Sequence, residues 1–282
     1  MSVTPAAHPL GQESRLRSLA DFYMTTMRTA IQTEFQYRAA TYMYLFGMVA
    51  EPVIYLVVWS TIADQSGGMV GGLTAGDLAA YYIVWTLVRT MNIVFTPYGW
   101  EERIREGQLS GQLLRPLHPI HYDIAQLAGG KIPWLLYYVP IAVVLTLAFD
   151  PTFDVRPFEV AVFAVAIWGA YLIRTFNQSA LGMVTFWTTR VGALFSLYIL
   201  LELLLSGRLV PLTLMPEWMQ TIAWLLPFRW TFYFPIEALV GDLSNAELVA
   251  GLGLQVFWIV VGIGVFSLMW KRAIRRYTAV GN

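Results

Sequence analysis

Six long apolar stretches dominate the chain. Each approaches the roughly 20 residues that a helix needs to cross the hydrocarbon core of a bilayer. They cover approximately residues 39–62, 77–96, 127–149, 158–187, 191–212 and 246–270. The fourth is too long for a straight crossing and contains Arg174 and Asn177, so a tilt, a kink or a cytoplasmic extension has to absorb the excess. The pattern predicts an all-α integral membrane protein with six transmembrane helices.

A different pattern precedes the first stretch. Over residues 15–35, apolar side chains such as Leu16, Tyr23 and Met27 share one helical face, and Arg17 and Arg28 lie on the other. This pattern indicates an amphipathic helix on the membrane surface, and it also fits a helix that packs on a soluble partner. We therefore expect a cytoplasmic tail with an interface helix over residues 1–38 and a six-span domain over residues 39–282.

The basic residues predict how the spans are oriented, because Lys and Arg are retained on the cytoplasmic side. Three basic residues fall on the side opposite the N-terminus, namely Arg156, Arg208 and Arg229. Thirteen fall on the side of the N-terminus: Arg15, Arg17, Arg28, Arg38, Arg103, Arg105, Arg115, Lys131, Arg190, Lys271, Arg272, Arg275 and Arg276. We expect both termini in the cytoplasm and a glycine-rich external loop over residues 63–76.

The composition narrows the class of protein. Hydrophobic residues make up 57% of the 282 residues and charged residues 13%, which argues against an ordinary soluble domain. The 18 basic and 18 acidic residues leave no positive excess of the kind that binds nucleic acid. The chain has no cysteine, which excludes disulfides and thiolate metal sites.

A short charged segment interrupts the cytoplasmic connection between the second and third spans. Charged residues fill most of residues 100–107, and Gly107 is a plausible helix C-cap. Trp100 and Ile104 lie four residues apart, so they predict an apolar tooth ringed by charge. This is what docking of a soluble subunit requires, although a solvated helical turn has the same pattern. The candidate coupling residues are Trp100, Glu101, Glu102, Arg103, Ile104, Arg105, Glu106 and Gly107.

The region after the fifth span is too apolar for a free loop and too rich in proline for a crossing. Irregular backbone at membrane depth is tolerated only inside protein or beside a cavity, so we expect two short half-helices, about 217–226 and 231–240, in a re-entrant hairpin over about 213–241. An interfacial aromatic belt has a similar composition. The gate candidates are Arg208, Pro211, Pro216, Trp218, Pro227, Arg229 and Pro235.

The order of these segments and two motifs carry a resemblance. The cytoplasmic motif combines Glu106-Gly107-Gln108-Leu109 with Leu113-Leu114-Arg115-Pro116-Leu117. The external motif combines Ser206-Gly207-Arg208-Leu209-Val210-Pro211 with Met215-Pro216-Glu217-Trp218, Leu226-Pro227-Phe228-Arg229 and Phe232-Tyr233-Phe234-Pro235. Over almost its whole length the chain resembles the type-2 ATP-binding-cassette (ABC) export permeases, and within them a bacterial subgroup formerly catalogued as a domain of unknown function.

This resemblance implies a half-transporter in the bacterial cytoplasmic membrane. Two six-span permeases, identical or paralogous, would form the pathway among the membrane lipids, and two separate ATPase subunits would bind ATP and Mg²⁺ and dock on the coupling helices. The chain itself would have no cofactor, no nucleotide site and no enzymatic activity. Its abundant aromatic surface suits an amphipathic or lipid-like substrate exported from the cytoplasm or the inner leaflet.

Four ionisable residues fall at membrane depth: Glu51, Arg89, Arg174 and Glu202. Each costs about 2.5–3.5 kcal/mol at a helix centre on insertion scales, so each is expected to face a cavity or an opposite charge. With Asn177 they are the candidate pathway residues, and fixed ion pairing between spans is the alternative interpretation.

Two other functions stay open. Acids near midplane also suit an ion-coupled secondary transporter, and a membrane-embedded transferase is a more distant possibility. His118, His121 and Asp123 lie close in sequence, but no further ligand completes a zinc set, so we expect no metal site.

Overall fold

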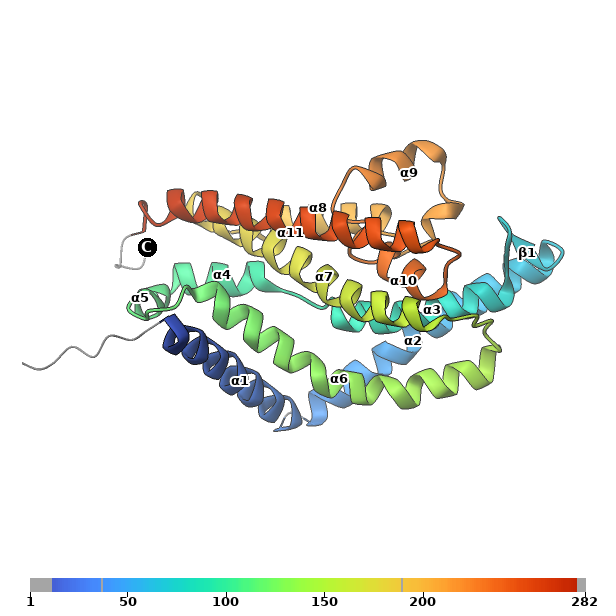
Figure 1. Ribbon diagram of the computed structural model, residues 1–282, viewed down its shortest axis with the longest axis horizontal. Helices are drawn as coiled ribbons and strands as arrows, with labels where there is room; N and C mark the ends of the chain where they lie inside the picture. The colour runs from blue at the N-terminus through green and yellow to red at the C-terminus, as the bar shows by residue number, and fades with distance from the viewer. Residues whose placement is uncertain (1–11, 37, 189, 278–282) are drawn as a thin grey trace, which may run out of the picture.

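The computed structural model describes residues 12–36, 38–188 and 190–277, and in this part of the chain the fold is helical apart from one small hairpin (Figure 1). The N-terminal tail before residue 12 lies outside the described residues. The elements in chain order are α1 (Gln12–Gln36), α2 (Arg38–Gln65), β1 (Met69–Val70), β2 (Leu73–Thr74), α3 (Ala75–Met91), α4 (Thr96–Arg105), α5 (Leu109–Leu113), α6 (Pro119–Phe149), α7 (Pro157–Gly182), the 3₁₀ helix η1 (Met183–Phe186), α8 (Gly192–Leu205), the 3₁₀ helix η2 (Leu212–Leu214), α9 (Glu217–Trp224), α10 (Tyr233–Val240) and α11 (Asn245–Ala273).

Five segments of the described chain are long and apolar enough to cross a membrane. They are Leu45–Gln65, Ala75–Arg105, Pro119–Phe149, Pro157–Phe186 and Asn245–Ala273. The all-α membrane class is therefore confirmed. The predicted span over 191–212 is helical only in α8, whose 14 residues extend about 21 Å, less than the roughly 30 Å of the hydrocarbon core. The helix ends early because Gly207 takes a left-handed conformation (φ +77°) just after the C-cap Ser206.

The helices form an elongated bundle with two distinct ends (Figure 1). At one end lie α4, α5 and the C-terminal end of α11, and at the other lie the β-hairpin and α9. Helix α7 packs on both α10 and α11, while α3 contacts α2, α6 and α10. Helix α3 is consequently central: nearly all of its side chains from Leu78 to Met91 are buried.

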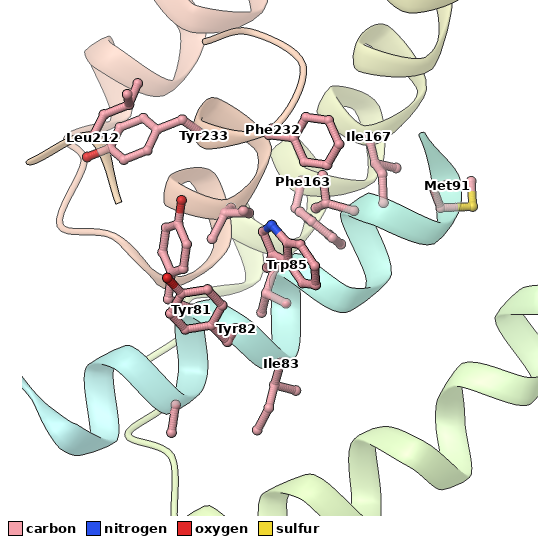
Figure 2. Close-up of a cluster of buried hydrophobic side chains, with 14 of the residues drawn as sticks. Tyr81, Tyr82, Ile83, Trp85, Met91, Phe163, Ile167, Leu212, Phe232 and Tyr233 are labelled. Carbon is pink, nitrogen blue, oxygen red and sulfur yellow. The ribbon is translucent and has the colours of Figure 1, made fainter. Parts of the chain in front are cut away.

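An aromatic core joins α3 to the second half of the chain (Figure 2). Tyr81, Tyr82 and Trp85 project from α3 towards Phe232 and Tyr233 at the start of α10. The Tyr81 hydroxyl donates to the carbonyl of Gly207 at 2.7 Å, and the Tyr82 hydroxyl donates to the carbonyl of Leu209 at 3.1 Å. These contacts hold the irregular residues after α8 against α3, so the backbone there is buried in protein, as the proline-rich sequence required.

The outer helices leave broad apolar faces uncovered. Exposed leucine, isoleucine and valine side chains run along α2, α6 and α11, including Ile54, Leu147 and Val260. Helices with an exposed apolar face of this kind suit lipid or another membrane subunit as their surroundings.

Helix α1 confirms the predicted helix over residues 15–35 and lies along the first half of α6 (Figure 1). Gly129 allows this approach, because a Cβ at that position would collide with the Met27 backbone. The Tyr23 hydroxyl lies 2.9 Å from Nδ1 of His121. Part of the apolar face of α1 is therefore covered by α6.

The predicted external loop over residues 63–76 contains the β-hairpin. Met69 pairs with Thr74 and Val70 with Leu73, and Gly71 and Gly72 connect the strands with φ of +57° and +87°. Two adjacent positive φ values are the requirement of a tight two-residue turn that glycine meets without strain.

A four-residue break separates α3 from α4. Asn92 caps α3 and donates from Nδ2 to the carbonyl of Thr231 at 2.7 Å. Lys131 of α6 donates from Nζ to the carbonyl of Ile93 at 2.8 Å and lies 4.9 Å from the centre of the Tyr171 ring. The assignment of Lys131 to the cytoplasmic side stays a prediction, but the residue is not a solvated loop charge: its side chain is buried inside the bundle and caps the broken helix.

Candidate transport site and coupling helix

Helix α4 occupies the place predicted for the coupling helix, over about 100–107, but it begins earlier, at Thr96. Pro97 stands in its first turn, where the missing N–H of proline costs nothing and its fixed φ favours helix initiation. The helix ends at the C-cap Glu106, and Gly107 follows with φ +70°. The predicted stop at Gly107 is confirmed.

Trp100 does not form the predicted apolar tooth. Its side chain is fully buried, and its ring lies 6.0 Å from that of Phe266 and 5.8 Å from that of Trp270 on α11. Ile104 is partly buried against the same cluster. Trp100 and Ile104 do share an apolar face of α4, as their i, i+4 spacing predicts. That face packs on the aromatic side chains of the C-terminal turns of α11.

Two charged residues of α4 fasten the helix to other parts of the bundle. Arg103 donates to both carboxylate oxygens of Asp123 on α6, at 2.9 and 2.8 Å, and its guanidinium lies 4.1 Å from the Trp100 ring. Glu101 accepts a 2.9 Å hydrogen bond from the backbone N–H of Val191, just before α8. Arg103 and Glu101 thus bond to other segments of the bundle, and the sequence pattern alone did not distinguish them from the exposed charges of α4.

The exposed face of α4 carries the remaining charges. Tyr98, Glu102, Arg105 and Glu106 are exposed, and with Glu101 they line a hollow of about 200 Å³. Arg105 lies 3.2 Å from the Glu101 carboxylate, and that carboxylate also receives the Val191 bond. A partner that binds in this hollow would therefore contact a helix directly connected to the start of α8.

The four predicted membrane charges form two ion pairs. Arg89 of α3 contacts Glu51 of α2 at 2.5 Å, and Arg174 of α7 contacts Glu202 of α8 at 2.7 Å. The first pair is partly exposed, whereas the second is almost sealed, with 5% of the Arg174 side chain and none of the Glu202 side chain exposed. The pairing that the sequence suggested is confirmed.

Arg208, predicted from sequence as a gate residue, approaches these pairs. Its guanidinium lies 3.9 Å from Glu51 and 5.8 Å from the centre of the Phe232 ring, and Arg174 lies 5.4 Å from the same ring. We call Glu51, Arg89, Arg174, Glu202 and Arg208 the charge cluster. It joins α2, α3, α7, α8 and the residues that follow α8.

The two predicted half-helices are present as α9 and α10. Pro216 is the N-cap of α9, and Pro235 lies in the first turn of α10. Pro211 precedes the 3₁₀ helix η2, and Pro227 accepts a turn hydrogen bond from Trp230. The prolines therefore mark the ends and turns of short helices, as expected for a hairpin that cannot continue as one span.

The half-helices differ in burial. Helix α10 packs into the core against α3 and α7, whereas α9 exposes Trp218 and Trp224. Arg229, between them, stacks on the Tyr233 ring at 4.9 Å. The expectation that both enter the outer leaflet stays a prediction.

Two further polar residues lie at contacts between helices of the bundle. Asn177, a predicted pathway residue, lies beside Gly262 of α11. Gln255, which the sequence pattern did not single out, donates from Nε2 to the carbonyls of Ala166 and Trp230 at 2.9 and 2.8 Å. A glutamine amid the apolar residues of the last span was the available signal, because a buried amide needs partners.

The three residues considered for a metal have separate partners. His118 accepts from the Ile120 N–H as the N-cap of α6, His121 meets Tyr23, and Asp123 meets Arg103. Burial, followed by the charge of His121, lowers the pKa of His118 to about 4, so its ring is neutral and able to accept that hydrogen bond near pH 7.

Comparison with protein families gives a match over most of the chain. The model of the ABC-2 family transporter protein matches residues 49–281, which covers every element from the middle of α2 onwards. The search of curated proteins found no match. The helical fold, the apolar spans and this match lead to one conclusion: the chain belongs to the ABC-2 transporter family and is a membrane component of it.

Proposed function

We propose that the chain is the permease subunit of an ATP-driven exporter, with six crossings, both termini in the cytoplasm and a second permease copy or paralogue beside it in the bacterial cytoplasmic membrane. In this arrangement α8, extended by the residues up to Pro211, serves as the fifth crossing. ATP and Mg²⁺ bind to separate ATPase subunits. The substrate is amphipathic or lipid-like and leaves from the cytoplasm or the inner leaflet.

The attachment of α4 is the observation that carries this proposal. The helix contacts α6 through Arg103 and Asp123, α11 through Trp100 and Trp270, and the start of α8 through Glu101. It packs on α7 as well, where a Cβ at Gly182 would press into the Trp100 side chain. A force applied to the exposed face of α4 therefore reaches four membrane helices, as a bistable rigid-body transition requires.

The ion-coupled alternative gains little from these contacts. It depended on Glu51 and Glu202 as acids near midplane, and each lies within ion-pairing distance of an arginine. An acid at membrane depth that is already paired with a protein cation needs no coupling ion to balance its charge.

The direct test is co-purification of the chain with an ABC ATPase subunit from the same organism. Charge reversal at Glu102 and Arg105, which are both exposed on α4, is expected to abolish co-purification. Glu217→Arg, an equally exposed acid at the start of α9, is the matched control and should leave the complex intact. Retention of the ATPase by the α4 variant would refute the placement of the coupling helix.

The direction of transport is tested in a separate experiment. Inside-out vesicles that contain the complex should accumulate a fluorescent amphiphile when ATP is added, and an ionophore should not stop this accumulation. Accumulation that survives ATP depletion but stops with the ionophore would instead support the ion-coupled transporter.

A further inference from the structure

The charge cluster carries an unbalanced positive charge. It contains three arginines and two glutamates, and both glutamates already lie beside an arginine, Glu51 with Arg89 and Glu202 with Arg174. Arginine stays protonated in proteins. Arg208 is therefore the additional cation, and its nearest carboxylate, Glu51 at 3.9 Å, is occupied by Arg89 at 2.5 Å.

Donor groups in the cluster are left without partners. The Nε atoms of Arg174 and Arg208 are buried and make no hydrogen bond within the described residues. Arg174 as a whole is 4% exposed. Buried donors in proteins nearly always have an acceptor, so each such atom calls for an explanation. On the sealed side, the unpaired Nε of Arg174 is accompanied by an acceptor of its own ion pair, Oε1 of Glu202, which also has no hydrogen-bond partner in the described part of the chain. At Arg208, an additional acceptor with negative charge would satisfy both the donor and the net charge.

One side of the cluster is accessible and the other is sealed. The side chains of Glu51, Arg89 and Arg208 are 30%, 23% and 21% exposed, whereas those of Arg174 and Glu202 are nearly inaccessible. The guanidiniums of Arg208 and Arg174 both lie within 6 Å of the Phe232 ring centre, so the accessible side and the sealed side of the cluster are adjacent. A ligand would therefore meet Arg208 and Arg89 first.

The surface next to the accessible side is apolar. Ile54 and Val58 lie three and seven residues after Glu51 on α2, so the three share a helical face, and both aliphatic side chains are exposed. A ligand with an acidic group at the arginines would place a hydrocarbon portion along these residues.

We propose that the accessible side of the charge cluster binds the acidic group, a carboxylate or a phosphate, of an amphiphilic substrate, with Arg208 as the principal contact. The planar fork of arginine suits both of these groups. This inference rests on the proposed transport function and deepens it, because it restricts the substrate to anionic amphiphiles.

The test is a binding assay on the purified full-length chain in nanodiscs of neutral phosphatidylcholine. The probe is a dansyl-labelled undecanoic acid, excited by energy transfer from the tryptophans, and its methyl ester is the uncharged counterpart. We expect saturable binding of the acid that oleate displaces and methyl oleate does not. Equal affinity for acid and ester would overturn the proposal.

Two variants with opposite expected signs separate binding from folding. Arg208→Gln removes the additional cation and should weaken binding of the acid by about tenfold or more, with the ester unchanged. Glu51→Gln removes an anion and should strengthen it. If both variants weaken binding alike, the cluster is only structural and the proposal fails. Arg208→Lys, which keeps the charge without the fork, should lie between Arg208→Gln and the unaltered chain.

The controls address the source of the anion and the state of the protein. Arg156→Gln changes an exposed cation at the start of α7, outside the cluster, and should leave the affinity unchanged. Inorganic phosphate, which has no hydrocarbon portion, should displace the probe far less effectively than a lysophosphatidic acid; equal displacement would refute the amphiphile part. The assay contains no ATPase, so its outcome is independent of the co-purification test.

Discussion

The buried pair of Arg174 and Glu202 allows the energetic role of charge inside the bundle to be measured. The perturbation is Glu202→Leu, which removes the carboxylate and leaves a side chain of similar size. Arg174 would then lie buried, 2.7 Å from where its partner stood, with its Nε still lacking an acceptor. Because Arg208 also interacts electrostatically with this pair, the loss of Glu202 increases the local excess of positive charge.

The expected magnitude follows from burial. An exposed ion pair contributes only about 0–1 kcal/mol, since water screens both charges. With 5% and 0% of its side chains exposed, this pair belongs to the buried class, in which removal of one partner costs about 3–5 kcal/mol. Removal of both charges in Arg174→Met/Glu202→Leu leaves no uncompensated cation at the site and is expected to cost less than about 1 kcal/mol.

The assay is reversible unfolding of the purified chain in mixed micelles, followed by circular dichroism as the denaturing detergent increases. The free energy of unfolding of the single variant, the Arg174→Met variant and the double variant completes a double-mutant cycle. A double variant that loses as much as the two single variants together would refute the reasoning, because it would show that the two charges contribute independently of each other.

Three further predictions concern other regions. Burial lowers the pKa of His118 to about 4, against about 6.5 in the unfolded chain, so the unfolded chain binds the proton more readily and stability should fall as the pH drops below about 6.5. The full shift corresponds to about 3 kcal/mol at pH 4, and because the ring is only half-buried we expect a loss of about 1–2 kcal/mol, measured by unfolding at each pH. His118→Asn, which retains a capping acceptor, should remove the slope. Arg103→Leu should cost about 3 kcal/mol in the same unfolding assay, because it leaves the buried carboxylate of Asp123 without its partner. The exposed Arg105→Leu is expected to cost about 0.3 kcal/mol, and a loss of about 0.5 kcal/mol or more would contradict this contrast. Gly251→Ala should lower the unfolding temperature, since its Cβ would meet the Phe234 ring, and Gly253→Ala, where the added Cβ meets open space, should not; equal effects would exclude the packing explanation.

Long apolar stretches predicted most of the helices, because a helix that crosses the hydrocarbon core needs about 20 mainly apolar residues. The helix stop at Gly107 and the start of α9 after Pro216 were also predictable. Ser244 and Glu247 have the spacing of a capping box and form one at the start of α11. Capping and termination are local properties, and neighbouring residues determine them.

The structure departs from these expectations where contacts between distant segments decide the outcome. Trp100 has the spacing of an exposed tooth, yet the direction in which its face turns depends on Trp270, distant in sequence. Lys131 was counted by its charge, although its environment depends on the carbonyl left free at Ile93. Residue type and spacing predict which face of a helix is apolar, but tertiary packing decides which other helix that face contacts.

In the candidate site, the sequence suggested that the two arginines and two glutamates at membrane depth form ion pairs, because an unpaired charge at that depth is costly. The approach of Arg208 to them was missed because it follows from the left-handed turn at Gly207, which sends the chain back over α3. A single backbone conformation thus determines the composition of the charge cluster.

The break between α3 and α4 has a kinetic consequence. Asn92 and Ile93 are held by different helices and segments, Asn92 by the Thr231 carbonyl and Ile93 by Nζ of Lys131 on α6. If α4 is to rotate against α3, these contacts have to be exchanged, and because Asn92 and Lys131 are both buried, each side chain needs a new partner before it can leave the old one. We expect this joint to impose an activation barrier between long-lived states, so the transporter would dwell in one orientation and change abruptly to the other.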